Sequence, residues 1–306
     1  MIFRHEYKDG VWIDLEQPTE DEIKQVSREF SISERIEMEL LSPTPAPLVS
    51  GDSQTAFLVL HFPAQGTNDG ETKSQEIDFV VASGFIITVR YEVIAPLHHL
   101  KKILEAQKLI TGRAPLTTDV LIEILFAHLY TAVRNHTSSI ASHLSRVEQD
   151  MFSGRERATV RTISDISREF LHLEAALANQ NEPLNRFLQS LVQRNFFDTT
   201  FSERAVRVAA ERTQVAHLVH TYRAVATDLR ETNSTLLAAR QNEIMKTLTV
   251  ITFSVLPLEL IALVFGMHAL GTPLEQNQNA FWIIMALMLG IAGVMTLFFA
   301  RKRWIF

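Results

Sequence analysis

One residue type and several motifs are missing from this sequence, and each absence narrows the class of protein. No cysteine occurs among the 306 residues, which excludes disulfide bonds and thiolate metal sites without fixing a redox compartment. The chain has no Gly-x-x-x-x-Gly-Lys loop, Gly-x-Ser-x-Gly elbow or His-Glu-x-x-His helix. The sequence therefore gives no support for nucleotide hydrolysis, and we predict that the protein is not an enzyme. The formal net charge of −6 gives no sign of nucleic-acid binding.

Charged residues are scarce near the C-terminus. Two apolar runs, 247–267 and 281–299, are separated by a short loop. Each run has about 20 residues, which at roughly 1.5 Å of rise per residue spans a hydrocarbon core of about 30 Å. We therefore predict a membrane protein in contact with lipid, with a C-terminal hairpin of two spanning helices.

The loop 268–280 contains no lysine or arginine. Basic residues instead flank the open end of the hairpin, with Arg240 and Lys246 before it and Arg301, Lys302 and Arg303 after it. Because positive residues are retained on the cytoplasmic side, both termini are predicted to be cytoplasmic and the protein to be a multi-pass component of the inner (plasma) membrane. The first nine residues contain no apolar run of the signal-peptide type, which also favours a cytoplasmic large domain.

Glycine is absent from residue 155 to residue 265, and only Pro183 and Pro257 interrupt that stretch. Its composition favours long helices, and the pattern predicts one helix ending near Phe152 and another over 157–180. Pro183 is the expected break, because proline suits the first turn of a following helix. From 184 to 256 no breaker occurs, so a single helix of roughly 110 Å is expected to enter the membrane, with a break near 195–200 as the alternative.

The first third of the chain has the short apolar runs of strands. Such runs predict strands at 11–15, 55–62, 77–81 and 85–90, with a tight hairpin between the last two. Thr19 to Glu22 has the spacing of a capping box that opens a helix. The predicted fold class is an α+β cytoplasmic domain with long stalk helices, followed by a transmembrane hairpin. Its parts are the α/β domain (1–115), the stalk region (116–246) and the hairpin (247–306), which comprises helix 247–267, outer loop 268–280, helix 281–299 and basic tail 300–306.

Several short stretches near the C-terminus occur in a specific order and spacing. They are Asn242 to Thr249, Leu256-Pro257-Leu258, Phe265-Gly266-Met267 and a terminal Arg-Lys-Arg-Trp-Ile. In these features residues 231–306 resemble the CorA superfamily of divalent metal cation transporters. The N-terminal two thirds resemble it only in architecture, and residues 271–273 and 280–282 are closer to its zinc-transporting ZntB branch.

The resemblance implies a homopentameric funnel in which the first spanning helix lines a central pore for Zn²⁺ or Mg²⁺, with no other cofactor. The composition of the two segments also indicates that the first helix meets water. Segment 281–299 has no ionisable residue, whereas 247–267 carries hydroxyl groups and Glu259. A stripe that alternates by three and four keeps one face toward an axis, although packed helices in any oligomer show such a stripe. Its members are Asn242, Met245, Thr249, Thr252, Leu256, Glu259 and Leu263.

The signature Gly266-Met267-His268 departs from the Gly-Met-Asn of the family. In the family that asparagine forms a ring at the outer mouth, where its carbonyl oxygens contact hydrated Mg²⁺. A neutral imidazole offers a nitrogen ligand, which suits zinc and other transition metals better. His268 is therefore predicted to bind metal and to shift selectivity or the pH response. Two alternatives are a histidine that only donates a hydrogen bond in the mouth, and a member that has lost transport.

Glu259 is a second departure, since the family usually has a neutral hydroxyl residue after Leu-Pro-Leu. Inserting a carboxylate at the centre of a transmembrane helix costs a free energy of about 2.5 to 3.5 kcal/mol on insertion scales. Five of them around one axis would repel one another, so some would hold protons unless a cation neutralised them. The hypothesis is that this ring binds the permeating dication or carries protons with it. A protonated glutamate bonded to a neighbouring helix is the alternative.

Cytoplasmic sites have weaker signals. Asp228 and Glu231 are candidate metal ligands by the resemblance, because family members gate through cytoplasmic metal sites between protomers, although a solvated helix face explains both. The pairs His217 with His220 and His136 with His143 share helix faces, and structural or solvent-facing roles are the favoured interpretation. The function indicated is divalent cation transport, with a non-conducting membrane-anchored metal sensor or scaffold as the alternative. The identity of the cation, the direction of transport and proton coupling stay open.

Overall fold

The computed structural model describes residues 2–63, 74–111, 116–267 and 279–302. The chain divides into two compact units, Met1–Arg230 and Glu231–Phe306. Helix α6 (Phe201–Gly266) begins in the first unit and ends in the second, which also contains α7 (Ala280–Arg301). The three-part division predicted from the sequence, with boundaries after 115 and 246, stays a prediction.

A six-stranded sheet forms the centre of the first unit. Its strands are β1 (Ile2–Tyr7), β2 (Gly10–Glu16), β3 (Leu48–Gly51), β4 (Ala56–Pro63), β5 (Ser74–Ala82) and β6 (Phe85–Arg90), in the order β1-β2-β6-β5-β4-β3. Only β2 and β6 pair in parallel. All four predicted strands and the tight β5–β6 hairpin are confirmed, with Ala82 paired to Phe85. Strands β1 and β3, at the two edges of the sheet, were not predicted.

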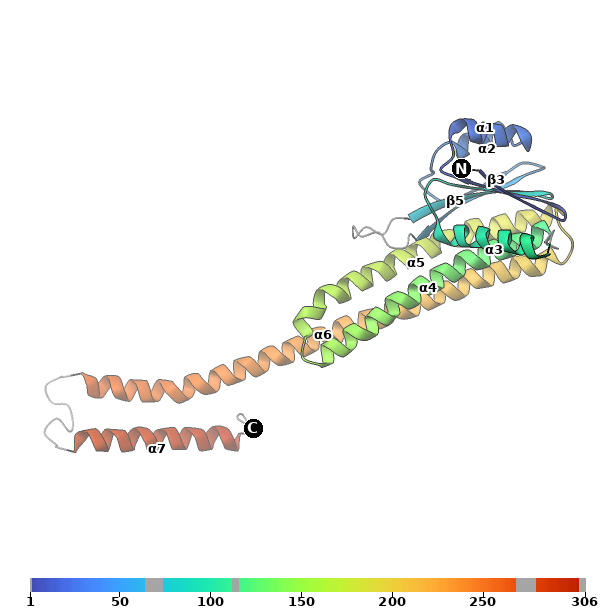
Figure 1. Ribbon diagram of the computed structural model, residues 1–306. Coiled ribbons are helices and arrows are strands. Elements are labelled where there is room, and N and C mark those ends of the chain that lie inside the picture. The colour runs from blue at the N-terminus through green and yellow to red at the C-terminus, as the bar shows by residue number, and fades with distance from the viewer. Residues whose placement is uncertain (1, 64–73, 112–115, 268–278, 303–306) are drawn as a thin grey trace. The chain divides into compact units, whose positions relative to one another are not determined.

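Helices cover both faces of this sheet (Figure 1). On one face lie α1 (Glu20–Glu29) and α2 (Glu34–Leu40), which pack their apolar residues on Ile13 and Leu15 of β2. On the other lie α3 (Ala95–Thr111), α4 (Thr118–Phe152) and α5 (Glu156–Gln193). There Phe79 stacks on Phe126 at a centroid distance of 5.0 Å. Helices α2 and α3 were not predicted.

The predicted capping box at the start of α1 is confirmed. The Glu22 amide donates to Thr19 Oγ1 at 3.3 Å, and the Thr19 amide donates to Glu22 Oε2 at 2.9 Å. These two bonds satisfy N–H groups that the first turn of a helix leaves without partners. The local sequence therefore determines where this helix begins.

The prediction of a break at Pro183 is wrong. Pro183 lies inside α5, which continues to Gln193. After Pro183, the side chains of Leu184, Phe187 and Leu188 are almost fully buried. Their packing keeps the helix continuous although proline has no N–H group and removes one backbone hydrogen bond. The chain turns instead at 194–200, where Asn195 has a φ of 51°. The alternative break near 195–200 is therefore confirmed, and a single helix from 184 to 256 is not formed.

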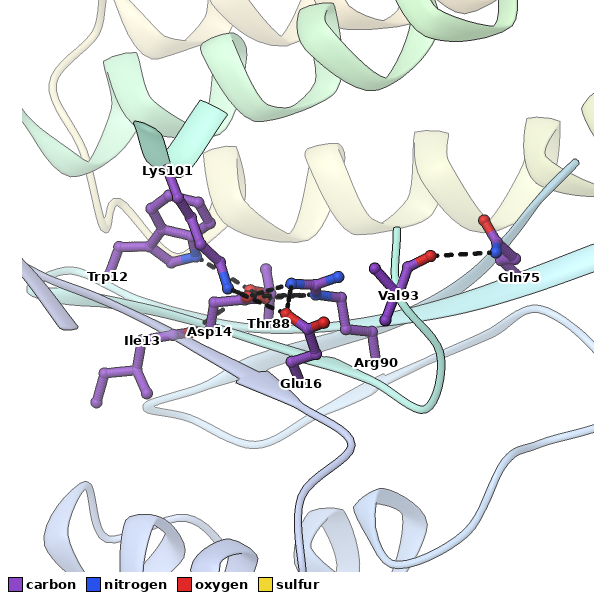
Figure 2. A network of polar contacts seen from close by, with 9 residues as sticks. All are labelled: Trp12, Ile13, Asp14, Glu16, Gln75, Thr88, Arg90, Val93 and Lys101. Carbon is purple, nitrogen blue, oxygen red and sulfur yellow. Dashed lines mark hydrogen bonds and ion pairs between the residues drawn. The ribbon is translucent and has the colours of Figure 1, made fainter. Parts of the chain in front are cut away.

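A network of buried charges ties α3 to the sheet (Figure 2). Arg90 and Asp14 are both completely buried, with Arg90 Nη2 3.0 Å from Asp14 Oδ2 and 2.5 Å from Glu16 Oε2. Lys101 of α3 contacts the same Asp14 oxygen, and Thr88 donates to Asp14 Oδ1 at 2.6 Å. Two cations thus face two carboxylates inside the protein. The bonds of Asp14 to three other side chains make it the centre of the network.

Gly10 is required by a close approach between β2 and the β5–β6 hairpin. A Cβ atom at this position would lie 2.2 Å from the carbonyl oxygen of Gly84. We expect Gly10→Ala to lower the free energy of unfolding by about 1–3 kcal/mol, because the strands would have to separate locally. Gly84→Ala is the matched control, since its Cβ would lie 3.8 Å from Asp9 O, an ordinary contact. Equal chemical-denaturation midpoints for the two variants would contradict this prediction.

Candidate cation pathway

The C-terminal part of α6 is apolar and exposed in the single chain. Leu256, Leu260 and Leu263 each have more than half of their surface exposed. Helices α6 and α7 are both long and apolar enough to cross a membrane, and little of their most apolar segments is buried within the chain. An apolar surface of this extent requires lipid or neighbouring helices around it.

The predicted stripe lies on this part of α6. Its seven residues are spaced by three and four along one continuous helix, so they share a face. The seven residues are Asn242, Met245, Thr249, Thr252, Leu256, Glu259 and Leu263. Thr249 is half-buried, and the other six are exposed. The structure therefore places the predicted pore-lining residues together, while their role in a pore stays a prediction.

Hydroxyl groups on this helix are oriented by bonds to the backbone. Thr249 Oγ1 donates to Met245 O at 2.7 Å, and Thr247 and Ser254 bond in the same way to the carbonyl four residues earlier. Because the hydroxyl proton is engaged within the helix, the lone pairs of Thr249 Oγ1 are left to accept from water or to contact a hydrated cation. The stripe thus alternates groups rich in oxygen with apolar side chains.

The outer signature is only partly described. Helix α6 ends at Gly266, and Met267 follows with 62% of its surface exposed. His268, the most specific metal ligand predicted from the sequence, and nearly all of the loop 268–280 lie outside the described residues. The end of α7 carries Arg301 and Lys302, the described part of the predicted basic tail.

Asp228 and Glu231 lie one turn apart on α6 and are both exposed. Among the described residues, no group of three or more histidine and acidic side chains is arranged to hold a metal ion. A role in metal binding would therefore need ligands from elsewhere, and the assignment of these two residues stays a prediction.

One histidine of each pair has an acidic partner that sequence spacing did not show. His220 Nδ1 lies 2.8 Å from Glu174 Oε1 of α5, and His136 Nε2 lies 3.2 Å from Glu169 Oε1. Hydrogen bonds from His220 and Arg223 lower the pKa of Glu174. The carboxylates come from a different helix, so no motif within one stretch of sequence could reveal them. These contacts fit structural roles for the histidines.

Comparison with known proteins decides the family. The family described as CorA-like Mg²⁺ transporter protein matches residues 7–303, nearly the whole chain. The chain belongs to this family. As a CorA-like protein it is a membrane protein and an ion transporter rather than an enzyme, in agreement with its two apolar C-terminal helices.

Individual relatives are distant but cover the chain. The cobalt/magnesium transport protein CorA of Methanocaldococcus jannaschii is 23% identical over 96% of this chain and 91% of its own length. The protein of the same name from Thermotoga maritima is 20% identical over 93% of this chain and 80% of its own length. The complete structure of the CorA magnesium transporter from M. jannaschii matches with a TM-score of 0.81 and 20% identity, over 98% of this chain and 93% of that one. The fold of this CorA-like chain, including the α+β part and the long helices, is thereby shown.

Proposed function

We propose that this protein transports divalent metal cations across the inner membrane through a pore on the axis of a homopentamer, lined by α6. Membership of the CorA-like family carries this proposal, and the stripe on α6 supports it. Exposed polar groups in a membrane segment need a water-filled or protein-lined surface, which a central pore would supply. Both termini would then be cytoplasmic.

The stripe suggests how a cation would move. Amide and hydroxyl oxygens of Asn242, Thr249 and Thr252 can contact a hydrated ion, while Met245, Leu256 and Leu263 would form apolar constrictions able to gate by dewetting. Glu259 would add a ring of carboxylates that binds the dication or carries protons with it. A dication that moves inward across 100 mV gains about 4.6 kcal/mol, which drives uptake without ATP.

The proposed ion is Zn²⁺ or Mg²⁺, and both the names of the relatives and the residue at position 268 bear on the choice. The relatives are named as cobalt/magnesium transport proteins, which favours a hydrated divalent cation such as Mg²⁺. Histidine at 268 favours zinc, because imidazole nitrogen is a better ligand for zinc than for Mg²⁺. A ring of His268 side chains at the outer mouth would therefore set the selectivity of this member.

Flux measurements with His268→Asn test the proposal. Proteoliposomes that contain the wild-type chain should take up Mg²⁺ or Zn²⁺, and His268→Asn should lower the ratio of Zn²⁺ to Mg²⁺ flux about tenfold, equivalent to about 1.4 kcal/mol of ligand preference. His217→Asn is the matched control, because His217 is exposed on α6 and is about 50 residues from the outer signature in sequence. It should leave the ratio unchanged.

Two outcomes would count against parts of this scheme. An unchanged flux ratio in His268→Asn would remove His268 from the selectivity mechanism. Absence of Mg²⁺ and Zn²⁺ flux from a correctly assembled wild-type oligomer would favour a membrane-anchored metal sensor or scaffold. In that case metal-dependent changes in protease sensitivity should persist without transport.

A further inference from the structure

Residues 42–47, with the sequence Ser-Pro-Thr-Pro-Ala-Pro, connect α2 to β3 and are held by side chains that titrate. We call them the proline segment. The Thr44 amide donates to both carboxylate oxygens of Glu76 at 2.9 Å, and Thr44 Oγ1 donates to Glu76 Oε1 at 3.0 Å. The carbonyl oxygen of Thr44 lies 2.9 Å from His61 Nε2. Because the three prolines have no N–H group, Thr44 carries most of the attachment of this segment to β4 and β5.

A second carboxyl group is buried directly behind the first. Asp78 lies two residues after Glu76 on β5, so both side chains are on the same face of the sheet. Asp78 is completely buried; its Oδ2 accepts from Tyr91 at 3.1 Å, and its Oδ1 has no partner among the described residues. A negative charge on Asp78 would therefore be poorly compensated.

The charges around Asp78 strengthen this preference for the neutral form. Burial and the neighbouring carboxylates of Glu76 and Glu39 raise the pKa of Asp78 well above its usual value, and the hydrogen bond from Tyr91 offsets only part of the effect. The carbonyl oxygen of Leu40, at the end of α2, lies 3.0 Å from the same hydroxyl, so the single proton of Tyr91 is shared between Leu40 O and Asp78 Oδ2. The pKa of Tyr91 is raised by burial and by Asp78, so it stays a neutral donor.

His61 completes the group on the opposite side of Glu76. Its Nε2 lies 3.4 Å from Glu76 Oε2, and the hydrogen bond to that carboxylate raises the pKa of His61 against the effect of burial. Burial alone would raise the pKa of Glu76, but hydrogen bonds from His61 and Thr44 outweigh it and lower that pKa. With His61 protonated, Glu76 ionised and Asp78 neutral, the three side chains sum to zero charge.

The proline segment has space beside it. Pro45, Pro47, His61, Pro63, His172 and Asn179 line a cavity of about 210 Å³. On the other side of His61, Gln180 of α5 donates to the His61 carbonyl oxygen at 2.7 Å and thus fixes the strand. The segment can therefore shift and admit water while β4 stays in place.

We propose that the proline segment is a proton-sensitive clasp: protons on His61 and Asp78 hold it against β4 and β5, and their loss releases it. When both protons leave, the three side chains change from zero to two negative charges in a buried space, and Glu39 adds repulsion of the same sign. Among the described residues, His172 is the other titratable side chain that lines the cavity.

The direction of the pH effect follows from the pKa shifts. The pKa of His61 is raised above its usual 6.5, so its stabilising contribution is complete below that value and is lost as pH rises through the folded-state pKa. The pKa of Asp78 is raised as well, so its contribution is complete only below its usual value of 3.8 and is lost as pH rises from there toward the folded-state pKa. Glu76 has a lowered pKa and stays ionised until strongly acidic pH. The clasp is therefore closed in mildly acidic solution and opens as pH rises.

Hydrogen exchange of the full-length chain in detergent tests the clasp. After correction for the intrinsic pH dependence of exchange, protection of the Thr44 amide should fall about tenfold between pH 6.5 and 8.5, equivalent to about 1.4 kcal/mol of opening free energy. The amide of Leu58, in the buried centre of β4, should keep its protection. Constant protection of Thr44 over this range would overturn the proposal.

Two variants separate the clasp from general stability. Asp78→Asn keeps the size of the side chain but removes its titration, so it should reduce the pH dependence at Thr44 and leave the part that His61 contributes. Tyr91→Phe removes the hydroxyl contacts with Asp78 and with the Leu40 carbonyl oxygen but leaves the carboxyl groups, so it should weaken protection while the pH dependence persists. The same pH dependence in Asp78→Asn and wild type would refute the role of Asp78. This inference goes beyond the proposed function and is independent of it, since the readout is backbone protection and not flux.

Discussion

Glu259→Gln is expected to lower divalent-cation flux in proteoliposomes about tenfold or more and to flatten its dependence on an imposed pH gradient. Glutamine keeps the size and a carbonyl oxygen but cannot carry a charge or exchange a proton. If a ring of Glu259 side chains neutralises the dication in the low-dielectric part of the pore, its loss removes an attraction worth at least 1.4 kcal/mol, a factor of ten in rate.

The matched control for this prediction is Glu182→Gln. Glu182 is an exposed residue of α5 that pairs with Arg186 one turn later, outside the proposed pathway. Its substitution should leave both flux and pH dependence unchanged. A Glu259→Gln protein that transports like wild type under every gradient would refute a role for the carboxylate and favour its alternative, a neutral side chain bonded to a neighbouring helix.

Asp14→Asn is expected to have the largest effect on folding, with a loss of about 3–5 kcal/mol. The carboxylate contacts Arg90 and Lys101 and accepts from Thr88, all inside the protein. Removing its charge leaves two buried cations opposite the single carboxylate of Glu16. The measurement is the thermal unfolding midpoint of the full-length chain in detergent, which should fall by roughly 6–20 °C.

Asp165→Asn is the control for this substitution. Asp165 faces Arg161 at 4.0 Å on the surface of α5, where both side chains are more than half exposed. Such surface ion pairs contribute little to the free energy of unfolding, so the thermal midpoint of Asp165→Asn should differ from that of the wild type by no more than about 2 °C. Similar midpoints for the two variants would show that the buried network is not a main support of the sheet.

The strands and helices found from the sequence are those whose own residues define them. The capping box at Thr19 and the Ser83-Gly84 turn are local signals, and both elements form as predicted. Strand β3 and helix α2 are short, and their positions depend on neighbours that are distant in sequence. Pro183 was misinterpreted for the same reason, because buried side chains beyond it hold α5 together and a local rule cannot include that packing.

The candidate sites divide in a similar way. The stripe on α6 was predictable, since a regular helix places residues spaced by three and four on one face. The proline segment is visible in the sequence as three closely spaced prolines, but its bonds to Glu76 and His61 link residues up to 32 positions apart. No spacing rule connects such residues, so the proposed clasp was not predicted.

The sequence by itself determined the two apolar C-terminal helices, the long helices and the resemblance to the CorA superfamily, because hydrophobic runs, missing glycine and ordered motifs are properties of contiguous residues. Only the tertiary structure decided which charges meet. Asp14 with Arg90 and Lys101, Glu174 with His220, and Glu76 with His61 and Asp78 each bring together separate elements. Burial then sets the charge state of such groups, since desolvation and neighbouring charges act through space and not along the chain.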